Sequence, residues 1–114
     1  MTDISSIVRY DRAVPVDFGE IMPGARGLVW HVKHIDCDAA VEAGKIHDKA
    51  GLDVERGIAV LAACVASWEW GENTWHGEVP ELSEEKAREI LTEARWMVAP
   101  LVKAAQDLGN FTAD

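Results

Sequence analysis

Two histidines and a cysteine recur at every third position, as His31, His34 and Cys37, and His47 and Cys64 follow further along the chain. Imidazole and thiolate groups bind zinc, but a structural zinc site needs four ligands in a tetrahedron. We predict a strand over residues 28–35, and on a strand positions 31 and 34 point to opposite faces. The spacing therefore favours surface histidines, and we predict neither a metal nor another cofactor.

A second candidate for chemistry is a cysteine–histidine pair, in which the base activates the thiol. Cys64 lies between Leu61 and Val65 on a predicted core helix, where a small buried apolar side chain is the commoner explanation. The sequence also lacks a glycine-rich phosphate loop, a Gly-x-Ser-x-Gly motif and a His-Glu-x-x-His motif. We therefore predict no catalytic residue, and a binding protein rather than an enzyme.

Tryptophan is unusually frequent, with five residues against one tyrosine and two phenylalanines. Large rings can close the core of a short domain, and we predict this role for Trp30, Trp68 and Trp96. Trp70 and Trp75 lie in a stretch rich in Gly, Asn and Pro, where complete burial is harder to arrange. Exposed aromatic side chains anchor partners at interfaces, so partner contact and packing are equally favoured for these two residues.

Charge and length exclude several classes of protein. The chain has 114 residues, and 20 acidic against 11 basic side chains give a net charge of −9. The bases are scattered singly, which disfavours nucleic acid and anionic membranes as partners. The N-terminus lacks the pattern of a signal peptide, and no apolar run approaches the roughly 20 residues that span a bilayer. We therefore expect a cytoplasmic protein with reduced thiols.

The elements that must position these residues begin with a β-hairpin over residues 14–35, after a polar arm at 1–13 that is predicted to be flexible. From residue 38 the apolar spacing becomes helical. A first helix is predicted over 38–50, with Gly51 as its C-cap. A second, the expected core helix, begins at Asp53. Its apolar stripe consists of Val54, Ile58, Leu61, Val65 and Trp68.

Two further helices are predicted to form a helical hairpin. One begins at Ser83, a good N-cap. The other spans about 96–108, and Pro100 requires that it start near residue 99 or kink. We thus predict a mainly helical α+β domain over residues 14–111, in which the β-hairpin precedes a helical part (38–111) of about four short packed helices, followed by a tail at 112–114. The predicted core comprises Trp30, Ile58, Leu61, Val65, Trp68, Ile90, Leu91 and Leu108.

Residues 59–111 carry a succession of motifs. Trp68-Glu69-Trp70 ends a helix, and Pro80-Glu81-Leu82-Ser83-Glu84-Glu85 begins the next. Ala87-Arg88-Glu89-Ile90-Leu91 follows, then a joint from Trp96 to Pro100, then Gly109-Asn110-Phe111. In this order the segment resembles the small tail assembly chaperones of long-tailed, non-contractile phages and prophages, the group that includes the lambda tail chaperone. Pro100 departs from the pattern, because it follows the aromatic residue of the joint.

The resemblance implies a chaperone that binds the tape measure protein in the host cytoplasm, keeps it soluble, and helps the major tail (tube) protein polymerise around it. Such a chaperone is absent from the finished virion. The expected binding groove is the joint between the third and fourth helices together with the loop between Trp70 and Trp75. Its predicted residues are Trp70, Trp75, Trp96, Met97 and Leu101. Two alternatives stay open, a structural head–tail connector or tail-completion protein and a generic helical adaptor.

Overall fold

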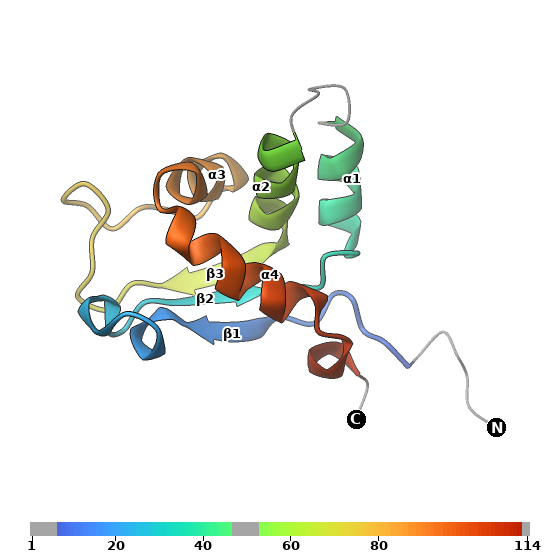
Figure 1. Ribbon diagram of the computed structural model, residues 1–114, viewed down its shortest axis with the longest axis horizontal. Helices are drawn as coiled ribbons and strands as arrows, with labels where there is room; N and C mark the ends of the chain where they lie inside the picture. Colours follow the sequence, from blue (N-terminus) through green and yellow to red (C-terminus); the bar gives the residue numbers. More distant parts are fainter. Residues whose placement is uncertain (1–6, 47–52, 113–114) are drawn as a thin grey trace.

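A computed structural model describes residues 7–46 and 53–112, and within these residues it shows the predicted α+β fold (Figure 1). The β-hairpin comes first, four short α-helices follow, and a third strand lies between the second and third helices. None of the helices in this part of the chain combines the length and the apolar character that crossing a lipid bilayer requires.

The sheet is antiparallel, with the order β1-β2-β3. Its strands are β1 (Val14–Asp17), β2 (Val29–Val32) and β3 (Val65–Glu69). Val16 pairs with Trp30 across the hairpin, which confirms the predicted pairing of the first two strands. Two short 3-10 helices, Phe18–Glu20 and Pro23–Ala25, make the connection between β1 and β2.

One face of the sheet is packed and the other is open. Val16, Trp30 and Val32 point to the packed face and are buried. Pro15 and Ser67 point to the other face and are exposed. Because successive strand residues alternate between faces, this pattern of burial places the core on the helical side of the sheet. In Figure 1, α4 (Val98–Gln106) lies across the strands on that side.

The third strand corrects one prediction. The core helix was expected to continue to Trp68, but α2 (Asp53–Cys64) ends earlier, and Val65 begins β3. On a regular strand positions 65 and 68 would point to opposite faces, but the pairing with β2 shifts register between Val65 and Ser67, and both Val65 and Trp68 are half-buried. Pairing with β2 supplies hydrogen bonds for the main chain and packs Trp68 against Trp30, with tilted rings whose centroids lie 4.9 Å apart. Tertiary pairing therefore overrides the local helical pattern.

The remaining helices begin close to where the sequence predicts. The α1 helix (Asp38–Ile46) starts as expected, and the predicted C-cap Gly51 lies outside the described residues. The α3 helix (Glu84–Glu93) follows Ser83, whose side chain accepts a hydrogen bond from the Lys86 N–H. A 3-10 turn, Arg95–Met97, leads into α4, so Pro100 falls in the first turn, where proline is tolerated.

Most of the predicted core residues lie inside the domain. Trp30, Ile58, Leu61, Ile90 and Leu91 are buried, while Val65 and Trp68 are half-buried. Leu108 differs, since 51% of it is exposed. The reason is that α4 ends at Gln106, and the following 3-10 turn buries Phe111 instead.

The two ends of the described chain lie together. Val8 forms a β-bridge with Thr112, and the Arg9 N–H donates to the Phe111 carbonyl at 2.7 Å. Within the predicted arm at 1–13, Val8, Arg9 and Arg12 bond to Phe111 or Thr112. The predicted tail at 112–114 likewise begins with a residue that is paired.

Candidate functional site

Three of the residues predicted to bind a partner are buried. The exposed fraction is 6% for Trp70, 2% for Met97 and 0% for Leu101. The Trp70 ring lies 6.3 Å from that of Trp30 and 5.6 Å from that of Trp68, measured between centroids. This aromatic cluster holds Trp70 at the end of β3, so its ring is part of the core and is not an accessible anchor.

The other two predicted anchors are partly accessible. Trp75 is half-buried, and its indole N–H donates to the Glu89 carboxylate on α3 at 3.3 Å. Hydrogen bonds from Lys86 and Trp75 lower the pKa of the Glu89 carboxyl below its ordinary value. Trp96 is 41% exposed and meets Phe18 edge-on at a centroid distance of 5.6 Å. The predicted site, the connection between α3 and α4 together with the loop between Trp70 and Trp75, is thus mostly packed into the core. Of its five predicted residues, only Trp75 and Trp96 are accessible at the surface.

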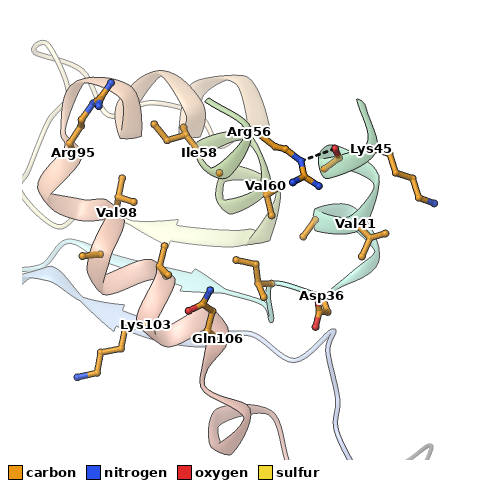
Figure 2. Close-up of a pocket in the computed structure, with 16 residues that line it drawn as sticks. Asp36, Val41, Lys45, Arg56, Ile58, Val60, Arg95, Val98, Lys103 and Gln106 are labelled. Carbon is orange, nitrogen blue, oxygen red and sulfur yellow. Dashed lines mark hydrogen bonds between the residues drawn. The ribbon is translucent and has the colours of Figure 1, made fainter. Parts of the chain in front are cut away.

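A different surface is hollowed. A cavity of about 1280 Å³ opens between α1, α2 and α4 (Figure 2). Apolar side chains from all three helices line it, including Val41 of α1, Ile58 and Val60 of α2, and Val98 and Val102 of α4. Small residues at Ala40, Gly44, Gly57 and Ala99 widen the groove between the helices. We call this hollow the α1–α2–α4 groove.

Basic side chains surround the α1–α2–α4 groove. Its described lining includes four of them and one acid, Asp36. The bases are Lys45, Arg56, Arg95 and Lys103. Lys45 and Lys103 extend outward from the rim in Figure 2, and Arg56 reaches from α2 to donate to the Gly44 carbonyl of α1 at 3.2 Å. In a chain with 20 acids and 11 bases, this lining has a local excess of basic side chains, and Lys45 also pairs with Glu42 on α1 at 3.5 Å.

The size and the lining of the groove indicate what it can hold. Pockets for small molecules usually enclose about 300–1,000 Å³ and carry a few polar groups that fix the orientation of the ligand. The α1–α2–α4 groove is larger, it is open to solvent, and its floor is aliphatic. An amphipathic helix buries its apolar stripe in such a surface. Acidic residues beside that stripe would meet the basic rim.

The sequence contained one signal for this groove. On α4, Leu101 and Ala105 are buried, while Val98 and Val102 form a second apolar pair four residues apart. A helix with one buried face needs a single stripe, so a second stripe indicates a further contact surface. The basic rim carried no such signal, because its residues come from three helices.

The histidines and cysteines that were considered as metal ligands do not converge on one site in the described residues. His31 points to the open face of the sheet, where Nε2 lies 3.2 Å from a Glu69 carboxylate oxygen. His34 was expected at the surface, but it follows β2 and is buried between Tyr10 and Phe111, and its Nδ1 accepts from the Asp36 N–H at 2.9 Å. His47 lies outside the described residues. Nowhere in the described ranges do three His, Cys, Asp or Glu side chains converge as a metal site would require.

Comparison with known proteins adds no relative. No protein-family model matches the chain, and neither a curated protein nor a solved structure matches it.

Proposed function

We propose that this protein is a tail assembly chaperone of a long-tailed, non-contractile phage or prophage, and that it binds a helical segment of the tape measure protein in the α1–α2–α4 groove. The observation that supports the proposal best is the apolar groove with a basic rim on an otherwise acidic protein. The motifs in residues 59–111 suggest the family, and the groove supplies a surface for its partner.

The physical requirements of such a chaperone match the groove. A long helical client exposes an apolar stripe until the tail tube surrounds it, and unprotected stripes associate with one another. A chaperone whose groove covers the apolar stripe of the client prevents this association, and it needs no active site to do so. The net charge of −9 keeps complexes of chaperone and client apart in solution.

The experiment is co-expression with fragments of the tape measure protein encoded beside it, followed by measurement of the soluble fraction and a pull-down. The test variant is Val41→Asp, which places a carboxylate on the α1 wall of the groove. Val41 is 43% exposed, so the substitution should cost little stability. The matched control is Val79→Asp, the same change at a loop position that is 62% exposed and lies outside the groove lining.

We expect the wild type and Val79→Asp to keep the client soluble and to bind it, and Val41→Asp to lose both effects. Equal capture by both variants would exclude the groove as the binding surface. Failure of the wild type to bind any tape measure fragment would overturn the function itself. Recovery of the protein from purified particles would instead identify a structural tail component.

A further inference from the structure

The two cysteines are 27 positions apart in the sequence and lie together in the fold. Cys37 directly precedes α1, and Cys64 is the last residue of α2. Both helix ends lie beside the sheet in Figure 1. The His34 carbonyl is close to both residues, since it accepts from the Cys37 N–H at 2.9 Å and lies 3.6 Å from the Cys64 sulfur. The two thiols lie close enough for each to shift the pKa of the other.

The two thiols have different surroundings. Cys37 is 4% exposed and contributes to the wall of a surface cavity of about 440 Å³. Cys64 is fully buried behind it. A small reagent in the cavity therefore meets Cys37 first. The charged and titratable side chains around this cavity are Arg9, Tyr10, Asp11, Lys33, Asp36 and Asp38.

Hydrogen bonds and charge favour ionisation of Cys37. The hydrogen bond from Cys64 is the largest cause that lowers the pKa of the Cys37 thiol, and it outweighs the burial that raises it. The Ala40 and Ala39 N–H groups at the start of α1 and the positive charge of Lys33 lower the pKa further. The interaction with the Cys37 thiol, followed by burial, raises the pKa of Cys64. Both shifts favour ionisation of Cys37, at the cavity, over ionisation of Cys64 behind it.

We infer that Cys37 and Cys64 are a redox-active dithiol, in which Cys37 reacts with a peroxide and Cys64 then closes a disulfide between the start of α1 and the end of α2. The inference rests on the two cysteines, their shared contact with His34 and the cavity. It does not depend on the proposed partner.

The chemistry proceeds in two steps. The Cys37 thiolate attacks one oxygen of hydrogen peroxide, the O–O bond breaks, and hydroxide leaves, so that Cys37 becomes a sulfenic acid. The Cys64 sulfur then attacks the Cys37 sulfur. The S–O bond breaks, the Cys64 proton passes to the leaving oxygen, and water departs. Two thiols lose two electrons, and with the proton that Cys37 released on ionising, the peroxide is reduced to two water molecules.

The test exposes the reduced full-length protein to hydrogen peroxide, quenches it, and measures intact mass under non-reducing conditions. We expect a monomer that has lost two hydrogen atoms, and a peptide cross-link that joins Cys37 to Cys64. Two free thiols after this treatment, or a disulfide only between two copies of the chain, would overturn the inference.

Two variants assign the separate roles. Cys64→Ala should stop at the sulfenic acid, which dimedone traps on Cys37. Cys37→Ala should leave Cys64 unmodified, because the buried thiol lacks access to the cavity. Dimedone labelling of Cys64 in Cys37→Ala, with Cys37 unlabelled in Cys64→Ala, would reverse the assignment. The mass measurement on the wild type decides the inference even if a variant fails to fold.

Discussion

The main chains of Gly27 and Gly71 approach each other closely, just before β2 begins and just after β3 ends. A Cβ atom built on Gly71 would lie 3.0 Å from the Gly27 α-carbon, and both glycines have positive φ angles, 91° and 58°. The Asn73 side chain fixes the same corner by donating to the carbonyls of Arg26 and Trp70, each at 2.8 Å. This corner determines the direction in which the chain leaves β3 and enters the loop after Trp70.

Gly71→Ala should therefore destabilise the protein. The left-handed conformation alone costs a residue with a side chain about 1–2 kcal/mol, and the methyl group must also displace the main chain at Gly27. The measurement is the free energy of unfolding in urea. Gly24→Ala is the control, because a Cβ there meets no atom within 4 Å among the described residues. An equal loss in both variants would contradict this account of the corner.

Truncating Trp70 should also cost stability. We expect Trp70→Ala to lower the free energy of unfolding by about 3–5 kcal/mol, because its ring packs against two other tryptophans in the core. Trp70→Phe should cost less, on the order of 1–2 kcal/mol, since the buried Trp70 N–H has no hydrogen-bond partner among the described residues. Trp96→Ala, at a 41% exposed position, should cost about 1 kcal/mol. A thermal midpoint unchanged by Trp70→Ala would contradict its place in the core.

The sequence predicts those parts of the fold that depend on interactions between residues close together in the chain. Ser83 caps α3 because its own hydroxyl reaches the Lys86 N–H three residues later. Pro100 restricts the start of α4 because it lacks an N–H. Alternation around Trp30 predicts β2 because strand side chains alternate between faces. Each of these inferences needed only residues that are neighbours in the chain.

The sequence did not reveal features that depend on distant partners. Residues 65–69 fit a helix as well as a strand, and pairing with β2 decides between the two. The sequence left packing and partner contact equally favoured for Trp70, and its position after that strand places its ring in the core. Cys37 and Cys64 are brought together by the packing of α1 on α2. Their separation along the chain gave no indication that the two thiols meet.

The basic rim should contribute to partner binding through charge. Lys45→Ala and Lys103→Ala should each weaken the binding of an acidic amphipathic helix roughly 2- to 5-fold at low salt, with the difference shrinking as salt screens the rim. Affinities measured by fluorescence anisotropy across a salt series test this. Lys86→Ala on α3 is the matched control, because its salt bridge with Glu89 lies outside the groove lining. A loss of affinity that is independent of salt would contradict an electrostatic role.

Oxidation of the dithiol should raise stability. A bridge from Cys37 to Cys64 encloses α1 and α2. By lowering the conformational entropy of the unfolded chain, a loop of that length should raise the free energy of unfolding by about 3.5 kcal/mol. We expect the thermal midpoint of the oxidised protein to exceed that of the reduced protein by on the order of 10 °C, with full reversal by dithiothreitol. Cys37→Ala is the control, and peroxide should leave its midpoint unchanged. An oxidised wild type that melts at or below the reduced midpoint would show that the bridge strains the fold.

The reactivity of Cys37 should persist at a pH where an ordinary thiol is protonated. The lowered pKa means that the folded protein keeps the thiolate as pH falls below the ordinary thiol value of about 8.5, and loses it only when pH falls through the lowered pKa. The rate of alkylation by iodoacetamide, followed by mass across a pH series, gives the midpoint directly. Cys64→Ala removes the hydrogen bond that lowers this pKa most, so its midpoint should move to higher pH. Lys33→Ala should move it in the same direction by less, because the charge of Lys33 is a smaller cause. Identical midpoints in the wild type and Cys64→Ala would mean that the buried thiol does not stabilise the thiolate.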